Sequence, residues 1–289
     1  MILEGKTLSK EIRDGLKTRV QTCQSKLNRP LKLVGIGWQG GYASYLYLQK
    51  EIEAAAKLGI QGQIIELTDT TTVEELLKIL KDLSADTNVD AILIPKPLPK
   101  HLDTPAVWEA LDAEKDIDGA AVFNMGRLFL CKTYKEIDAM KGFAPCTAKA
   151  VMLLLDYHKV DLNGTEVAVI GRSTTVGKPL AQMLMAKNAT VKVCHSRTKD
   201  IKASLSNSDV VVCAIGAARF LRADMIKPGA VVVDVGTNQD DKGVYCGDVD
   251  YDEVVKVASA VSPVPGGVGP LTLTCLLENI VISAERKIK

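Results

Sequence analysis

Short apolar runs alternate with amphipathic stretches along this 289-residue chain, and no other feature limits its fold so strongly. The predicted strands cover residues 32–36, 63–67, 90–94, 166–170, 190–194, 209–215 and 230–235. Helical periodicity or composition marks residues 8–20, 44–58, 73–83, 180–186 and 271–287. Strands that alternate with helices form parallel sheets covered by helices, so we expect an α/β fold with buried strands.

A glycine turn, GRSTTVGKP at residues 171–179, joins the predicted strand 166–170 to an apolar helix. Backbone N–H groups and the helix dipole favour an anion at such a turn. The usual dinucleotide pattern has glycine where this chain has Ser173. However, the next strands lead to further glycines, Gly216 and Gly236. Ligands of open α/β sheets collect at the carboxyl ends of strands, so we predict a dinucleotide site rather than a turn that only reverses the chain.

The end of the second strand of this block decides which dinucleotide is expected. A site for NAD usually places an acidic residue there to hold a ribose hydroxyl. Here the segment is VCHSRT, residues 193–198, which contains no acid. Arg172, Ser196 and Arg197 suit the extra phosphate of NADP, because arginine binds phosphate through charge-assisted hydrogen bonds. We therefore predict NADP, with the alternative that Arg197 is an ordinary solvated charge.

Residues 120–148 interrupt the strand–helix rhythm, and a chain of 289 residues suits two domains of ordinary size. We predict a parallel α/β substrate domain at residues 1–148 and a Rossmann-like dinucleotide-binding domain at residues 149–270. The C-terminal helical segment, residues 271–289, is predicted to pack back on the first domain and to complete it.

Composition excludes several classes of protein. Lys and Arg number 36 against 35 Asp and Glu, without long runs of either sign, so we expect no nucleic-acid partner. We predict no membrane segment, because the N-terminus lacks a signal-peptide pattern and no uninterrupted apolar run approaches spanning length. Seven scattered cysteines without a CxxC pair predict a reduced, cytoplasmic protein, and three distant histidines predict no metal site.

Seven motifs then carry a family resemblance. They are KDIDG (115–119), NMGRL (124–128), PCT (145–147), GRSTTVGKP (171–179), CHSRT (194–198), GDVD (247–250) and PVPGGVGPLT (263–272). Together they resemble the methylenetetrahydrofolate dehydrogenase/cyclohydrolase family over nearly the whole chain. The resemblance implies a two-domain homodimer of one-carbon metabolism that acts on tetrahydrofolate derivatives. Hydride passes from the methylene bridge to the nicotinamide, and most members then hydrolyse the methenyl product to the formyl compound.

The resemblance also implies roles for individual residues. Tyr47 would lie along the substrate, and the Asp118 carboxylate would bind the two-donor edge of the pterin. The alternatives are a core tyrosine and a turn-capping aspartate. Gly267 and Pro270 are the other predicted substrate-binding residues, in a segment whose glycines let backbone approach both ligands. The predicted cofactor-binding residues are Gly171, Arg172, Ser173, Val176, Gly177, Ser196, Arg197, Gly216, Gly236, Thr237 and Thr272.

The chain departs from the family at the residues used for hydrolysis. The family's lysine, four residues after the tyrosine, corresponds to Glu51 here. The family's glutamine corresponds to Pro95, which offers no side-chain amide and no backbone N–H. Ala148 and Ala150 stand where proline and glycine are usual.

We therefore predict an NADP-dependent methylenetetrahydrofolate dehydrogenase with weak or lost cyclohydrolase activity. Its predicted catalytic residues are Tyr47, Glu51 and Asp118. One alternative is a fully bifunctional enzyme in which Lys50 or Lys96 replaces the family's lysine. Another is a catalytically silent paralogue that binds folate or dinucleotide, and a third is an oxidoreductase of a different reduced pterin.

Overall fold

The computed structural model describes residues 1–239 and 243–288, and its contacts divide the chain into two compact units. The N-terminal unit consists of Glu11–Arg127, Met140–Cys146 and Leu276–Lys289. The C-terminal unit consists of Met1–Lys10, Leu128–Ala139 and Thr147–Cys275. Each unit is thus assembled from three separate segments of the chain. The predicted domain ranges, 1–148 and 149–270, stay a prediction.

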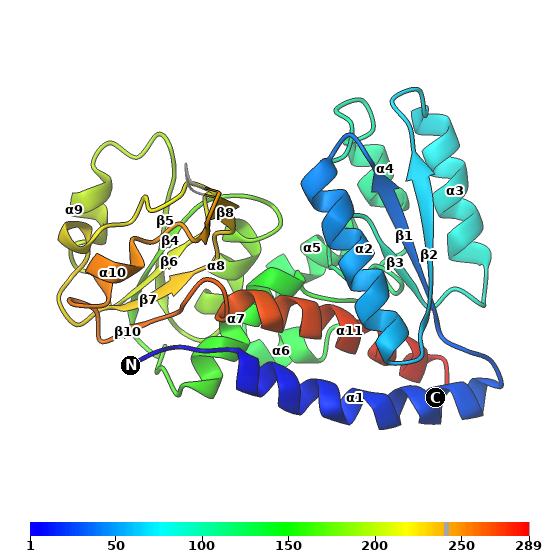
Figure 1. Cartoon of the computed structure of the whole chain (residues 1–289), viewed down its shortest axis with the longest axis horizontal. Coiled ribbons are helices and arrows are strands. Elements are labelled where there is room, and N and C mark those ends of the chain that lie inside the picture. Colours follow the sequence, from blue (N-terminus) through cyan, green and yellow to red (C-terminus); the bar gives the residue numbers. More distant parts are fainter. Residues whose placement is uncertain (240–242, 289) are drawn as a thin grey trace. The chain divides into compact units, whose positions relative to one another are not determined.

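The N-terminal unit contains a three-stranded parallel sheet in the order β2-β1-β3 (Figure 1). Its strands are β1 (Lys32–Trp38), β2 (Gln61–Leu67) and β3 (Ala91–Leu93). Val34 in the central strand pairs with Gln63 of β2 and with Ile92 of β3. The three strands predicted in this half are confirmed, and the sheet is parallel as expected.

Helices pack on both faces of this sheet because side chains of β1 alternate between them. The helices are α2 (Tyr42–Lys57), α3 (Val73–Ala85) and α4 (Pro105–Ala110). Val34 and Ile36 are fully buried in a core cluster that includes Leu80 of α3 and Trp108 of α4. Gly35 points to the opposite face, where an added Cβ would lie 2.6 Å from Leu48 Cδ1 of α2. The missing side chain therefore lets α2 lie close to the sheet.

The last helix, α11 (Val268–Arg286), passes from the C-terminal unit into the N-terminal unit. In the N-terminal unit the Asn279 amide donates to the Ile117 carbonyl at 2.8 Å, and the Ser283 hydroxyl donates to the Asp90 carbonyl at 2.6 Å. The prediction that the last helix packs back on the first domain is confirmed. By length and composition this helix could cross a membrane, but 61% of its apolar 18-residue window is buried inside the protein, as in a core helix.

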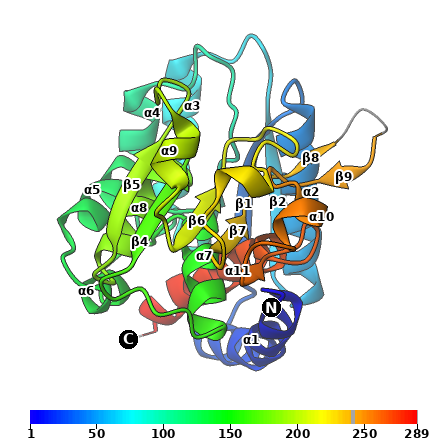
Figure 2. The same ribbon diagram turned by 90° about the vertical axis from the view of Figure 1, so that its left-hand side faces the viewer.

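The C-terminal unit contains a five-stranded parallel sheet in the order β10-β7-β6-β4-β5 (Figure 1), and Figure 2 shows its strands β7, β6, β4 and β5 from another side. Its strands are β4 (Glu166–Ile170), β5 (Thr190–Cys194), β6 (Val210–Cys213), β7 (Val231–Asp234) and β10 (Ala260–Val261). The helices of this part of the chain are α7 (Cys146–Tyr157), α8 (Gly177–Met185), α9 (Ile201–Leu205) and α10 (Tyr251–Val254), with a 3₁₀ turn, η1 (Ala223–Met225). The predicted Rossmann-like fold is confirmed.

Several elements differ from the sequence-based prediction. β6 and β7 are shorter than predicted, and α11 begins at Val268 rather than at residue 271. Residues 120–148 contain α5 (Val122–Leu130) and α6 (Tyr134–Asp138), which the interrupted periodicity did not predict. The two-residue strand β10 and the antiparallel pair of β8 (Asn238–Gln239) and β9 (Tyr245–Cys246) were also not predicted. Their runs are too short to carry periodicity.

Candidate active site

One face of α2 carries the first two predicted catalytic residues. Tyr47 and Glu51 are four residues apart, so their side chains are neighbours on the helix surface. Tyr47 is 50% exposed, whereas Glu51 is half-buried. Lys50 is exposed, and its ammonium lies 5.9 Å from the centroid of the Tyr47 ring. The structure therefore turns Glu51 inward and leaves Lys50 at the surface.

The third residue, Asp118, lies on a loop that hydrogen bonds hold in place. The buried carboxylate of Asp116 accepts from the Ala121 N–H at 2.7 Å and from the Asn124 amide at 2.8 Å. The same Asn124 amide donates to the Ala113 carbonyl at 3.0 Å. Asp116 and Asn124 thus fix the loop. The sequence did not predict this role, although the two residues belong to the motifs KDIDG and NMGRL.

The pKa values of both the Asp118 and the Glu51 carboxyl groups are raised. Burial raises the pKa of Asp118 to about 7, and the negative charge of Asp116 adds to this, against hydrogen bonds from the backbone and thiol of Cys146. Burial likewise raises the pKa of Glu51 to about 8, and the charge of Asp118 contributes second. The two carboxyl groups therefore hold less than their full negative charge near neutral pH.

The two carboxyl groups favour ligands that stabilise their ionised forms. A ligand that donates two hydrogen bonds to Asp118 would favour the ionised form of that carboxyl. A positive charge beside Glu51 would favour its ionised form in the same way. The site is suited to a donor-bearing ring in which positive charge develops.

Pro95, at the position of the family's glutamine, and the candidate replacement Lys96 both follow β3. Pro95 is half-buried and has no side-chain hydrogen-bond donor. The Lys96 ammonium lies 4.1 Å from the centroid of the Trp108 ring and 3.5 Å from Asp103 Oδ1. The charge of Lys96 is therefore engaged by a cation–π contact and an ion pair.

The other departures, Ala148 and Ala150, are both fully buried in α7. Alanine is the residue most favourable to a helix, so this substitution suits the first turns of α7.

The glycine turn in the C-terminal unit has the geometry of a phosphate cradle. Gly171 has φ +126°, and a Cβ there would lie 2.3 Å from the Ala214 carbonyl oxygen. A Cβ on Gly177, at the start of α8, would lie 2.1 Å from the Gly171 carbonyl oxygen. Ser173 is exposed, and its hydroxyl accepts from the Val176 N–H at 3.1 Å. Only glycines permit this close turn, and its exposed rim fits the phosphates of a dinucleotide.

The other predicted cofactor residues mostly lie at the carboxyl ends of neighbouring strands. Ser196 and Arg197 are exposed on the turn after β5, and Arg172 is exposed beside Gly171. Gly216 follows β6 with φ +66°, whereas Gly236 and Thr237 follow β7. The turn after β5 is fixed by a hydrogen bond of 2.8 Å from the Thr198 N–H to the His195 carbonyl.

Three predicted residues belong to the segment that leads into α11. The Gly267 N–H donates to the Pro263 carbonyl at 2.8 Å. The Pro270 carbonyl accepts from the Thr274 hydroxyl at 2.9 Å, and the Thr272 hydroxyl donates to the Val268 carbonyl at 3.4 Å. Gly267, Pro270 and Thr272 all belong to the C-terminal unit, whereas Tyr47, Glu51 and Asp118 belong to the N-terminal unit.

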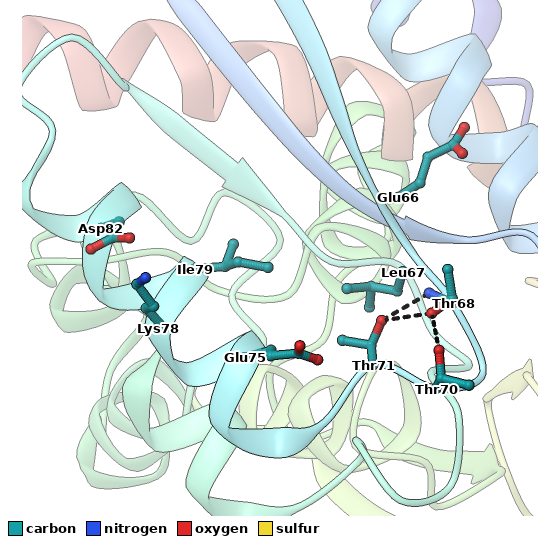
Figure 3. Close-up of a pocket in the computed structure, with 9 residues that line it drawn as sticks. All are labelled: Glu66, Leu67, Thr68, Thr70, Thr71, Glu75, Lys78, Ile79 and Asp82. Atoms are coloured by element: carbon teal, nitrogen blue, oxygen red, sulfur yellow. Dashed lines mark hydrogen bonds between the residues drawn. The ribbon is translucent and has the colours of Figure 1, made fainter.

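A surface hollow lies elsewhere in the N-terminal unit, beside the end of β2 and along α3 (Figure 3). Its lining residues are Glu66, Leu67, Thr68, Thr70, Thr71, Glu75, Lys78, Ile79 and Asp82. The Thr68 hydroxyl pairs with those of Thr70 and Thr71 at 3.0 and 3.2 Å. None of these lining residues is a predicted site residue, so this hollow does not define the candidate active site.

Comparisons with known proteins agree with these features. Residues 3–118 match the family model "Tetrahydrofolate dehydrogenase/cyclohydrolase, catalytic domain", and residues 145–288 match its "NAD(P)-binding domain". The "Bifunctional protein FolD" of Elusimicrobium minutum is 60% identical over 288 residues, which cover 100% of both chains.

Solved structures of similar proteins give the same result. The bifunctional FolD enzyme of Campylobacter jejuni is 39% identical, with a TM-score of 0.92 over 99% of each chain. The Trypanosoma brucei methylenetetrahydrofolate dehydrogenase-cyclohydrolase, complexed with NADP cofactor and inhibitor, is 33% identical. Its TM-score is 0.90, with coverage of 100% of this chain and 98% of that chain.

The sheets, the glycine turn and the matched models define a two-domain α/β protein with an NAD(P)-binding domain. The chain belongs to the tetrahydrofolate dehydrogenase/cyclohydrolase family. The family resemblance drawn from the sequence motifs is confirmed.

Proposed function

We propose that the protein is an NADP-dependent methylenetetrahydrofolate dehydrogenase whose cyclohydrolase activity is weak or lost. The observation that carries this proposal is the position of Glu51, which lies on the inner side of α2 and interacts with Asp118. Family membership supports the dehydrogenase reaction, and the NADP bound to the Trypanosoma brucei relative supports the choice of cofactor.

Each residue of the carboxyl pair has a part in the proposed reaction. The Asp118 carboxylate accepts two hydrogen bonds from the amide N–H and amino group of the pterin, and Tyr47 lies along the substrate. Bound NADP would accept the hydride, held by the turn of residues 171–177 and by Arg197. As the methylene bridge becomes a methenyl cation, the Glu51 carboxylate stabilises the new positive charge, more strongly as water is excluded.

Hydrolysis of the methenyl product has different requirements. Attack by water and cleavage of a carbon–nitrogen bond need a suitably tuned group that transfers protons. Glu51 and Pro95 stand where the family has its lysine and glutamine, and Pro95 has no proton to offer. The relatives named as bifunctional support the alternative in which Lys50 or Lys96 takes over. Against it, Lys50 is exposed and Lys96 is engaged by Trp108 and Asp103.

The proposal is tested by comparing wild-type protein and Arg197→Asp in the oxidation of methylenetetrahydrofolate with NADP and with NAD. Wild-type protein is expected to form methenyltetrahydrofolate efficiently with NADP. Arg197→Asp is expected to lose about 1.5–3 kcal/mol of NADP binding while NAD binding is spared, because one charge-assisted contact to the extra phosphate is removed. Lys199→Asp, an exposed charge change on the same turn, is the control. No turnover with either cofactor would contradict the function, and equal wild-type efficiency with both would contradict the preference.

We also infer a cytoplasmic homodimer. All seven cysteines remain as thiols in the described part of the chain, which supports a reducing compartment. Phe129 and Leu130, at the end of α5, are 74% and 77% exposed. Exposed large apolar side chains of this kind support burial against a second copy of the chain.

A further inference from the structure

Two buried carboxylates, neither of them a predicted site residue, lie at the carboxyl edge of the five-stranded sheet. The Asp248 side chain belongs to the GDVD motif and has no exposed surface. It accepts hydrogen bonds from the backbone N–H groups of Ile215, Gly216 and Ala217 at 2.7, 3.1 and 2.8 Å. A fourth bond, of 2.8 Å, comes from the side-chain amide of Asn238. Asp248 therefore joins the loop after β6 to the first residue of β8.

The second carboxylate, Asp234, holds Asp248 in place. Asp234 ends β7 and accepts from the N–H groups of Gly236, Asp248 and Val249 at 2.9, 2.9 and 3.0 Å. A Cβ on Gly236 would lie 2.2 Å from Asp248 Oδ1. Gly236 is thus required by the packing of this carboxylate, whatever its contact with a ligand.

The donors to the two carboxylates come from several separate segments of the chain. They are backbone N–H groups of residues 215–217, 236 and 248–249 and the side-chain amide of Asn238. A buried carboxylate is costly unless hydrogen bonds compensate it, so these segments must keep the conformation that supplies the donors. Gly216, Gly236 and Thr237, three predicted cofactor residues, lie on the two loops that Asp248 and Asp234 hold. The carboxylates therefore fix backbone at the edge of the sheet where dinucleotides bind.

We propose that Asp248 is a positioning residue for the dinucleotide, because its carboxylate sets the conformation of residues 215–217 and 236–238. This proposal rests on the cofactor part of the proposed function. A neutral amide cannot replace the carboxylate, since an asparagine in either orientation points its own NH₂ group at two of the four N–H donors. The loops then have to move to avoid that contact.

The test compares Asp248→Asn with Asp250→Asn, a matched change two residues further in the same motif. The Asp250 side chain makes no capping hydrogen bond to α10 in the described structure. NADP affinity, measured by direct titration, is expected to fall about ten- to a hundredfold in Asp248→Asn and to stay unchanged in Asp250→Asn. Tetrahydrofolate affinity is expected to stay unchanged in both variants. Hydrogen exchange of the 215–217 amides is expected to be faster in Asp248→Asn only.

A second variant, Asn238→Ala, removes one donor and leaves the carboxylate in place. It is expected to weaken NADP binding by a smaller factor than Asp248→Asn does. If thermal melting shows that Asp248→Asn is unfolded, Asn238→Ala is used to test the proposal instead. Wild-type NADP affinity in a folded Asp248→Asn protein would overturn the proposal, as would unchanged affinity in Asn238→Ala if only that variant folds. Wild-type protein that binds NADP without oxidising methylenetetrahydrofolate would instead contradict the proposed function and leave this inference intact.

Discussion

Asp118→Ala is expected to lower kcat/KM for methylenetetrahydrofolate by about 10²- to 10⁴-fold and to leave NADP affinity nearly unchanged. The variant removes two charge-assisted hydrogen bonds to the pterin, each worth about 1.5–3 kcal/mol. Since about 1.4 kcal/mol corresponds to a tenfold change, their joint loss gives this range. NADP affinity is spared because Asp118 and the glycine turn belong to different compact units. Steady-state kinetics and NADP titration measure the two effects.

A matched control separates ligand binding from capping of the turn. Asp112 lies in the same segment, and its carboxylate accepts from the Glu114 N–H at 2.8 Å, as a turn-capping aspartate does. Asp112→Ala is expected to lower thermal stability with little change in turnover. Normal turnover in Asp118→Ala would mean that Asp118 is likewise only a capping residue.

Glu51→Gln is expected to slow hydride transfer by about ten- to a hundredfold without changing NADP affinity, because it removes charge with little change of shape. The pH dependence gives a second signature. The pKa of Glu51 is raised to about 8, so its charged form is present above that pH and is lost as the pH falls through it. Wild-type kcat/KM is expected to decrease on acidification through about 8, and again near the pKa of Asp118, about 7. The variant is expected to lose the upper step.

Glu53→Gln provides the control, since Glu53 is exposed on the same helix and carries the same charge. It is expected to behave as wild-type protein in single-turnover rates and in the pH profile. A Glu51→Gln enzyme with the wild-type rate and both pH steps would show that Glu51 takes no part in hydride transfer.

Most of the sheet could be predicted from the sequence because buried parallel strands are continuous apolar runs. β4 and β5 begin and end where the apolar runs predicted. The pairing of β10 with β7, and the bridge between Ile2 and Val261, could not be predicted. These contacts join short segments without periodicity, and distant parts of the chain determine them.

The candidate site likewise has features that the sequence predicts and features that only the folded structure shows. Counting along α2 predicted that Glu51 replaces the family's lysine, because helix spacing is a local property. The effect of the Asp118 charge on Glu51, and of the Asp116 charge on Asp118, depends on tertiary packing. The motif GDVD was recognised only as a signature, since the donors to Asp248 come from loops after other strands.

The fate of methenyltetrahydrofolate tests the central claim most directly. Purified wild-type protein is mixed with methenyltetrahydrofolate, and the rate of its conversion to formyltetrahydrofolate is compared with the rate in buffer alone. Because Glu51 and Pro95 stand in place of the hydrolytic lysine and glutamine, the two rates are expected to be equal. Rapid conversion that depends on the protein would contradict the account, and its loss in Lys50→Ala would identify Lys50 as the replacement.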